Sequence, residues 1–269
     1  MRKINDSPLG IFDSGVGGLT VLREVLQQLP GEEFIYLGDT GRYPYGPRSA
    51  GIVRKFALQN ARFLMGFGIK VLIVACNTAS SVALDELRRW LAVPILGVIE
   101  PGAREAVRKT VNKRVGIIGT VGTIGSGAYH RAIADIDPDI KVFSTSCPLF
   151  VSLAEEGWLD GDIVESIVHH YLDEMSEKDI DTLILGCTHY PLLRELIQKV
   201  VGENVQVIDS AYALVRELNE LLVQENLLAR TKESANRYYV TDAPDKFKKI
   251  GQKFLGKKLD NVNLIEIDL

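Results

Sequence analysis

Short apolar runs alternate along this chain with amphipathic stretches, and this alternation restricts the possible folds more than any other feature. The runs are continuous and rich in Val and Ile, which is typical of strands buried on both faces of a sheet. Between them, apolar residues such as Leu22, Val25 and Leu29 recur at helical spacing. The pattern predicts an α/β protein with mainly parallel sheets and helices on both faces. Strands are expected within residues 9–12, 34–37, 71–75, 95–99, 115–118, 142–143, 183–185 and 205–208, with further short strands at 238–240 and 264–267.

Three segments recur later in the chain in the same order. Any two parallel strands resemble each other to some degree, but a nearly constant offset and the matched Cys76 and Cys187 favour a duplication. The sequence therefore predicts two similar α/β halves. The matching segments are 10–17 with 116–123, 72–78 with 183–189, and 95–100 with 204–209.

Polar residues stand where the predicted strands end. In open parallel sheets, ligands bind beyond the carboxyl ends of the strands. We therefore expect these residues to converge on one cleft between the two halves. They are Asp13, Ser14, Asp39, Thr40, Cys76, Asn77, Thr78, Thr120, Cys187, Thr188 and His189.

Two of the three cysteines carry the strongest chemical signal. A lone cysteine is usually a small buried apolar residue. Cys76 and Cys187, however, each end a predicted strand before a helix, whose free N–H groups favour a thiolate. Two thiols on opposite sides of a bound molecule could remove a proton from one face of a carbon and return one to the other, which predicts racemisation or epimerisation. Cys147 has no counterpart and is interpreted as structural, and the wide spacing excludes a disulfide framework and a CxxC metal site.

The loops after the strands point to a small anion. Helix starts near Ser14, Asn77 and Thr188 present backbone N–H groups that bind carboxylate or phosphate, although simple N-capping explains each one alone. A carboxylate is favoured over a polyphosphate because no arginine cluster accompanies these loops. A dinucleotide site is the alternative, with Gly15 and Gly17 followed by Asp39, but the third glycine of that motif is missing and the cysteines would have no role.

Three further residues are placed to assist the cysteines. His189 lies two positions after Cys187 and could tune or relay its proton. Asp13 is the acid expected nearest Cys76 if the first strand is central. Glu155 could orient His189. Each of these also has a plain interpretation as a capping or surface residue.

Charge and hydropathy exclude several classes of protein. The chain of 269 residues has 31 Lys+Arg against 35 Asp+Glu, a net charge of −4, which disfavours a generally basic nucleic-acid binder. No apolar run approaches the roughly 18 residues that cross a bilayer. The first eight residues lack the apolar core of a signal peptide, so the protein is expected to be cytoplasmic.

Several motifs in order resemble the glutamate racemase family. Together they are far more specific than any one alone, and they span residues 9 to about 211. They are DSGVGGL at 13–19, GDT at 38–40, PYGPR at 44–48, ACNTA at 75–79, GTVGTI at 119–124, CPLFV at 147–151, EEG at 155–157 and GCTHYPL at 186–192. Ser152 departs from the family, where proline is expected in many relatives.

The resemblance implies a cofactor-independent enzyme that interconverts L- and D-glutamate and supplies D-glutamate for peptidoglycan. It implies two flavodoxin-like domains, 1–99 plus 210–269 and 100–209, with the active site between them and no metal. The implied catalytic residues are Cys76, Cys187, Asp13, His189 and Glu155. The implied substrate-binding residues are Asp13, Ser14, Tyr45, Gly46, Asn77, Thr78, Thr120, Thr188 and His189.

Two alternatives remain open at this point. An aspartate racemase would keep both cysteines but accept a shorter side chain. A two-lobed carboxylate-binding protein would need the helix starts but not the thiols. Apolar residues on exposed elements make a homodimer an additional expectation.

Overall fold

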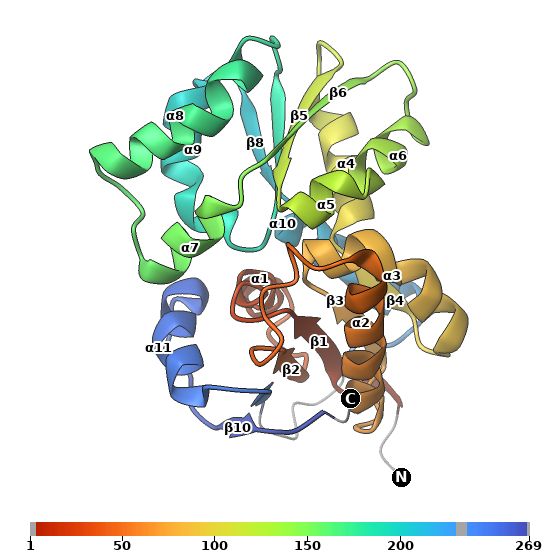
Figure 1. The fold of residues 1–269 in the computed structure, drawn as a ribbon. Helices are drawn as coiled ribbons and strands as arrows, with labels where there is room; N and C mark the ends of the chain where they lie inside the picture. The colour runs from red at the N-terminus through yellow and green to blue at the C-terminus, as the bar shows by residue number, and fades with distance from the viewer. Residues whose placement is uncertain (1–3, 230–235, 268–269) are drawn as a thin grey trace.

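The computed structural model describes residues 4–229 and 236–267, which form two parallel sheets with helices between the strands (Figure 1). The first sheet has the order β10-β9-β2-β1-β3-β4, and every neighbouring pair is parallel. Its strands are β1 (Leu9–Asp13), β2 (Phe34–Gly38), β3 (Val71–Val74), β4 (Ile95–Gly97), β9 (Arg237–Val240) and β10 (Val262–Leu264).

The second sheet repeats the strand order of the first. Its order is β6-β5-β7-β8, which corresponds to β2-β1-β3-β4, and all its pairs are parallel. The matching order supports the duplication expected from the sequence, and the predicted α/β class is confirmed. The strands are β5 (Arg114–Gly119), β6 (Lys141–Ser146), β7 (Thr182–Gly186) and β8 (Gln206–Asp209).

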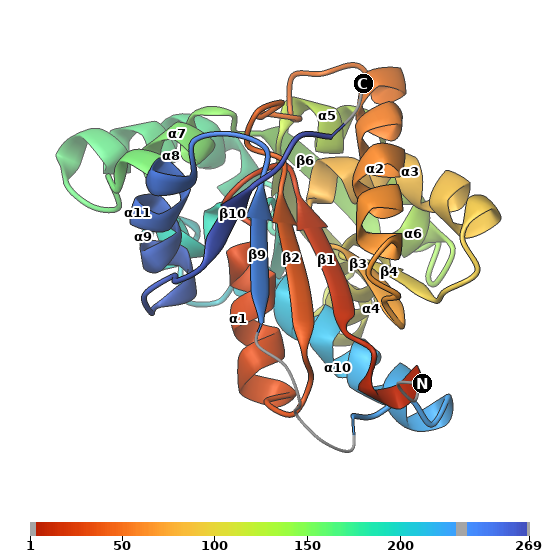
Figure 2. The ribbon, with the colours of Figure 1, turned by 90° about the horizontal axis from the view of Figure 1, so that it is seen from below.

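Helices cover both faces of the first sheet (Figure 2). Successive residues of β1 point to opposite faces, so Ile11 packs with α1 (Leu19–Gln28), whereas Phe12 packs with α2 (Ala50–Met65) and α3 (Asn77–Trp90). Burial on both faces explains why the strands read as continuous apolar runs. The remaining helices are α4 (Ile99–Lys109), α5 (Val121–Gly125), α6 (Ala128–Ala134), α7 (Leu149–Glu156), α8 (Asp162–Ser176), α9 (Arg194–Val201), α10 (Ser210–Gln224) and α11 (Pro244–Leu255), with 3-10 turns η1 (Ile4–Asp6) and η2 (Tyr190–Leu193).

The chain leaves the first half at α4 and returns to it at α10. Ile99 and Ala103 of α4 pack with Ile117 of the second sheet. Leu214 and Leu218 of α10 pack in the core that includes β1. The predicted domain boundaries lie beside the first residues of these two helices, and we retain them as a proposal.

Two predicted strand ends differ from the structure. The run 95–99 ends as a strand at Gly97, because Ile99 already begins α4. The strand expected at 264–267 is wrong, since β10 ends at Leu264. Ile265 still donates its N–H to the Val240 carbonyl, but Ile265 and Ile267 then pack on the core beside α2. Ile265 and Ile267 are apolar because they pack on this core, and not because the strand β10 continues through them.

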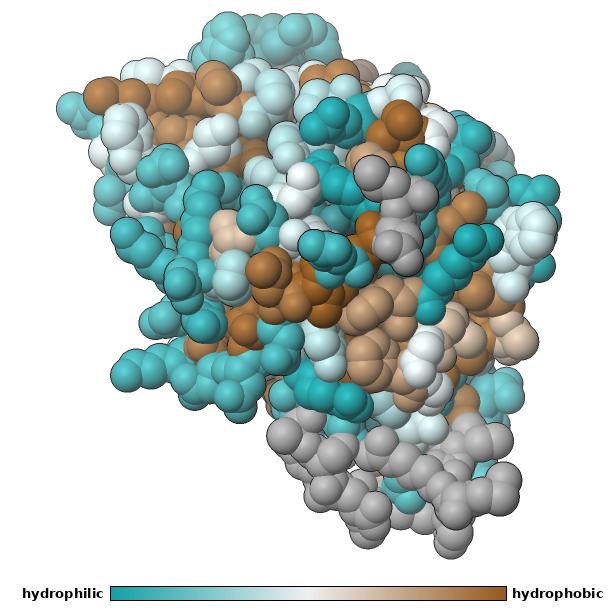
Figure 3. Space-filling view, turned by 60° about the horizontal axis from the view of Figure 1, so that its bottom comes forward, coloured by the Kyte–Doolittle hydropathy of each residue, from teal (hydrophilic) through white to brown (hydrophobic). Residues whose placement is uncertain are grey.

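The outer surface is mostly hydrophilic, with a band of apolar residues across the middle of the face in Figure 3. The large apolar side chains that are exposed include Trp90, Trp158 and Ile163. The homodimer expected from such residues stays a prediction. Within residues 4–229 and 236–267, no helix is both long enough and apolar enough to traverse a bilayer.

Candidate active site

A cavity of about 400 Å³ lies where the carboxyl ends of the two sheets face each other. Its lining includes every predicted catalytic or substrate-binding residue except Asp13, which is fully buried beside it. Both halves contribute, so the convergence expected from the strand ends is observed for these residues. Asp39 and Thr40, expected in the same cleft, do not line it, because their side chains bind Tyr45, Thr241 and Asp242. The predicted residues in the lining are Ser14, Tyr45, Gly46, Cys76, Asn77, Thr78, Thr120, Glu155, Cys187, Thr188 and His189.

Cys76 is positioned by the junction of β3 and α3. It is the N-cap of α3, and its Sγ accepts the N–H of Ala79 at 3.5 Å. Its thiol also lies 3.6 Å from the Ser14 hydroxyl, which comes from the loop after β1. The sulfur is therefore held between the loop after β1 and the start of α3.

Cys187 occupies the equivalent position after β7. Its Sγ lies 3.9 Å from Nδ1 of His189 and is close to the backbone N–H groups of His189 and Tyr190. The other ring nitrogen of His189, Nε2, lies 3.2 Å from Oε1 of Glu155 on α7. The Glu155 carboxylate thus contacts the His189 imidazole, which in turn contacts the Cys187 thiol, as expected from the sequence for Glu155 and His189.

Burial favours the protonated form of both thiols. Desolvation raises the pKa of Cys76 to about 12, and the negative charge of Asp13 adds to the effect. Desolvation likewise raises the pKa of Cys187, and the proximity of Cys76 contributes. The N–H groups at the helix starts lower both pKa values, but by less than burial raises them. The N–H groups at the helix starts thus favour the thiolate, as expected from the sequence, while burial opposes it.

Asp13 is the last residue of β1. This strand lies between β2 and β3, so it is central in the sheet, as expected from the sequence. Its Oδ2 accepts the N–H of Gly15 at 2.9 Å, whereas Oδ1 has no hydrogen-bond partner among the described residues. Burial raises the pKa of this carboxyl, while the charge of His189 lowers it. A buried carboxyl with one free oxygen near a thiol is suited to hold or release a proton.

Hydroxyl and backbone groups join the two halves around the cavity. The Thr78 and Thr120 hydroxyls lie 2.9 Å apart, although they belong to different halves. The N–H of Gly122 donates to the carbonyl of Gly46 at 2.9 Å. The Asn77 side chain donates to the Tyr129 hydroxyl, also at 2.9 Å. These contacts set the spacing between the two cysteine-bearing strand ends.

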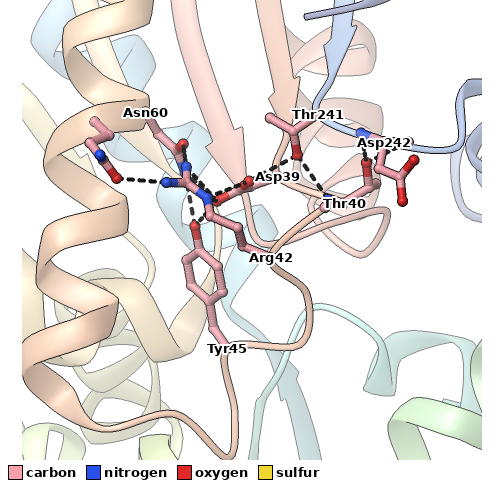
Figure 4. Close-up of polar contacts among 9 residues, drawn as sticks. Asp39, Thr40, Arg42, Tyr45, Asn60, Thr241 and Asp242 are labelled. Carbon is pink, nitrogen blue, oxygen red and sulfur yellow. Dashed lines mark hydrogen bonds and ion pairs between the residues drawn. The ribbon is translucent and has the colours of Figure 1, made fainter. Parts of the chain in front are cut away.

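Tyr45 lines the cavity, and its hydroxyl donates to the Asp39 carboxylate (Figure 4). Asp39 is fully buried and also binds Arg42 at 2.8 Å and the Thr241 hydroxyl at 2.9 Å. Asn60 donates to Tyr45 and accepts from Arg42. These contacts of Asp39, in the GDT motif, therefore hold Tyr45 and the neighbouring Gly46, in the PYGPR motif, in place.

Sequence reasoning missed part of the cavity wall. Tyr43, Val121 and Val151 line it, as does Ser152. Ser152 lies inside α7, which begins at Leu149, so the departure from proline does not disturb the start of this helix. Tyr43 directly precedes the PYG motif, and this adjacency was the signal that could have revealed it.

Cys147 and the two adjacent histidines, His169 and His170, lie outside the cavity lining. Cys147 is buried, with its Sγ 3.8 Å from the Thr145 carbonyl. His169 is exposed on α8 and lies 2.8 Å from Asp173. Within the part of the chain that the structure describes, no three His, Cys, Asp or Glu residues are grouped to hold a metal ion.

Comparisons with known proteins show that the chain is similar to amino-acid racemases. The sequence profile of the Asp/Glu/hydantoin racemase family matches residues 19–218. A glutamate racemase of Geobacter metallireducens is 49% identical over 97% of both chains. The glutamate racemase isoform RacE1 of Bacillus anthracis superposes with a TM-score of 0.94 at 41% identity over 98% of both chains. The Francisella tularensis glutamate racemase, solved with D-glutamate, gives a TM-score of 0.93 at 40% identity and covers 98% of this chain and 99% of that one.

Proposed function

The chain belongs to the Asp/Glu/hydantoin racemase family and is an amino-acid racemase, and from this premise we propose that it interconverts L- and D-glutamate by proton transfer between two cysteines. The observation that carries the proposal is the placement of Cys76 and Cys187 at equivalent strand ends of the two halves, on one cavity. Two thiols that approach a carbon from opposite sides are the requirement of a two-base racemase.

The reaction moves one proton off the α-carbon and another onto its opposite face. For L-glutamate, the Cys187 thiolate takes the α-proton and becomes a thiol, while the Cys76 thiol gives its proton to the carbanion and becomes a thiolate. The reverse direction exchanges the two roles, so each turnover leaves the opposite cysteine charged. The assignment of Cys187 to L-glutamate follows the family resemblance.

The raised thiol pKa values explain why a substrate with an ammonium group suits this cavity. A positive charge placed between Cys76 and Cys187 favours the thiolate that burial otherwise disfavours. Asp13 beside Cys76, and His189 with Glu155 beside Cys187, provide sites for the proton that each thiol releases. Substrate binding and thiol activation would then be a single event.

The substrate carboxylates are proposed to bind at the polar ends of the strands. The cavity is lined at the start of α3 by Asn77 and Thr78, and before η2 by Thr188 and His189. Backbone N–H groups at helix starts of this kind can bind a carboxylate. Ser14, Gly46 and Thr120 line the opposite parts of the same space. Fixed N–H dipoles and hydroxyls also stabilise the negative charge that develops at the α-carbon.

The cellular role belongs to the same proposal. D-glutamate made by this chain would supply peptidoglycan synthesis, with no cofactor, metal, membrane or nucleic acid required. Oxidation would remove the thiol bases, so we propose that the enzyme works in the reducing cytoplasm, as a homodimer.

Proton NMR of L-glutamate in D₂O with reducing agent tests the reaction, with circular dichroism followed on the same sample. Loss of the Cα–H signal together with decay of optical activity is the expected result. Exchange with retained optical activity would show one working base and contradict the two-base mechanism.

Aspartate is the control substrate for the main alternative. Faster racemisation of aspartate than of glutamate would reassign the substrate. If neither amino acid exchanges its α-proton but glutamate still raises the melting temperature, the chain is a two-lobed carboxylate-binding protein and not a racemase.

A further inference from the structure

Tyr43 connects the first half of the molecule to the carboxylate–imidazole pair of the second. It lies in the loop between β2 and α2, and its ring stacks on His189 with centroids 6.1 Å apart and planes inclined by 26°. Its hydroxyl is a side-chain hydrogen-bond partner of Glu155. One side chain of the first half therefore contacts both members of the pair that faces Cys187.

His189 is held from a second side by the same half. The ring of Phe254, on α11, meets the His189 ring edge-on with centroids 5.2 Å apart. Figure 1 shows α11 directly below α7, the helix that carries Glu155. The imidazole is thus contacted by two aromatic rings that come from widely separated parts of the sequence.

The charges around Glu155 also come mainly from outside its own helix. His189 and the Tyr43 hydroxyl lower the pKa of this carboxyl, and Lys246 of α11 adds a smaller effect in the same direction, against the opposing effect of burial. The Glu155 side chain is only 15% exposed, so its ionised form depends on these neighbours. Two of the three belong to the first half.

We propose that Tyr43 is a positioning residue for the Cys187 half of the reaction. Its hydroxyl and ring hold Glu155 and His189 in line with the thiol, and the alignment is complete only when the two halves are closed on each other. The thiol of Cys76 lies instead beside the Ser14 hydroxyl and the Asp13 carboxyl. The inference rests on the proposed racemase function and adds an asymmetry to it.

The asymmetry gives the proposal a specific signature. Because L- and D-glutamate are equally stable, kcat/KM must fall equally in both directions when any step is impaired. The isotope effects need not change equally. If the step at Cys187 becomes slower relative to the step at Cys76, the effect of α-deuterium on kcat/KM rises for L-glutamate and falls toward one for D-glutamate.

The test compares Tyr43→Phe, which keeps the ring, with Tyr43→Ala, which removes it. Tyr212→Phe is the matched control, because Tyr212 is exposed on α10. Racemisation and deuterium isotope effects on kcat/KM are measured in both directions, together with melting temperatures. For Tyr43→Phe we expect kcat/KM to fall about tenfold, the order expected when one hydrogen bond to a charged group is lost. The isotope effects should diverge between L- and D-glutamate, and more strongly in Tyr43→Ala.

The possible results separate cleanly. Divergent isotope effects with an unchanged melting temperature support the positioning role. Wild-type kinetics in Tyr43→Phe and Tyr43→Ala, or a loss of activity with equal isotope effects in the two directions, would overturn it. If the unmodified protein does not racemise glutamate, the proposed function fails first, and the inference fails with it.

Discussion

Cys76 and Cys187 lie at helix starts and yet have raised pKa values. A helix start contributes part of a unit positive charge, whereas full burial removes nearly all the solvation of a thiolate. The balance depends on how completely the two halves enclose each sulfur. A raised pKa slows the reaction of a buried thiol with oxidants and alkylating agents, because the thiolate is the reactive form.

Replacing either cavity cysteine by alanine should abolish racemisation. General acid–base groups contribute about 10²–10⁴-fold each, and a two-base reaction cannot proceed with one base missing. Cys76→Ser and Cys187→Ser should retain partial reactions, such as elimination from a substrate with a leaving group. Polarimetry with L- and D-glutamate measures the loss. The matched control is Cys147→Ala, which should racemise normally because Cys147 lies outside the cavity lining. Racemisation by Cys76→Ala would refute the two-base mechanism.

The Asp13→Asn variant should be more stable than the unmodified protein but less active. The pKa of Asp13 is raised by burial, so its contribution to stability is present below the ordinary carboxyl pKa and is lost as the pH rises through the raised value. The variant lacks this titration, so its unfolding free energy should increasingly exceed that of the unmodified protein as the pH rises toward neutrality. Thermal melts between pH 4 and 8 test this. Asp135→Asn, at an exposed aspartate, should show no such trend.

At the scale of elements, the loop between β2 and α2 depends on a buried ion pair. The Arg42 guanidinium binds Asp39 at 2.8 Å and Asn60 at 2.8 Å, and it lies 4.3 Å from the centre of the Phe56 ring. Thr241, at the end of β9, joins from the C-terminal segment. The C-terminal strands therefore help to hold the loop that forms one wall of the cavity (Figure 4).

Arg42→Met should destabilise the protein and raise KM. Removing one partner of a buried pair leaves the Asp39 carboxylate uncompensated, at a cost of about 3 kcal/mol in unfolding free energy. Looser packing of the loop moves Gly46 and Tyr43 relative to the second half. Urea unfolding and steady-state kinetics are the measurements. Arg48→Met, an exposed arginine of the same loop, is the control and should change neither quantity. Equal stability of the two variants would contradict the support assigned to Asp39.

At the scale of the whole molecule, the site exists only because the two halves approach closely. A Cβ atom on Gly17 would collide with the Thr188 hydroxyl and with the His189 ring. The Thr20 hydroxyl donates to the Thr188 carbonyl at 3.2 Å across the same contact. Glycine is therefore required at position 17 because the second half packs closely against it, and not because of the conformation of its own loop.

Gly17→Ala should separate the two halves without unfolding either. A displacement of about 1 Å at a reacting centre can cost on the order of 10²-fold in rate, so kcat/KM should fall by about that factor. The circular dichroism spectrum should stay unchanged, and small-angle scattering should show a more open molecule. Gly31→Ala, where an added Cβ meets nothing within 4 Å, should leave both activity and shape unchanged. Full activity of Gly17→Ala would show that the halves tolerate a wider gap.

The sequence by itself determined the α/β class, most of the strands and the duplicated organisation, because these depend on periodicity and local composition. It also determined where the polar residues collect, since parallel strands always end at a common edge. That rule, with the family resemblance, was enough to bring Ser14, Cys76, Thr120 and Cys187 to one cavity.

Only the tertiary structure decided how these residues behave. The pKa of Cys76 depends on its burial, and the Tyr45 hydroxyl binds Asp39, a carboxylate that Arg42 and Asn60 also contact. Tyr43 meets His189 across a contact between residues 146 positions apart in the chain. Burial, partner choice and charge balance are set jointly by segments distant in sequence, and no local pattern encodes them.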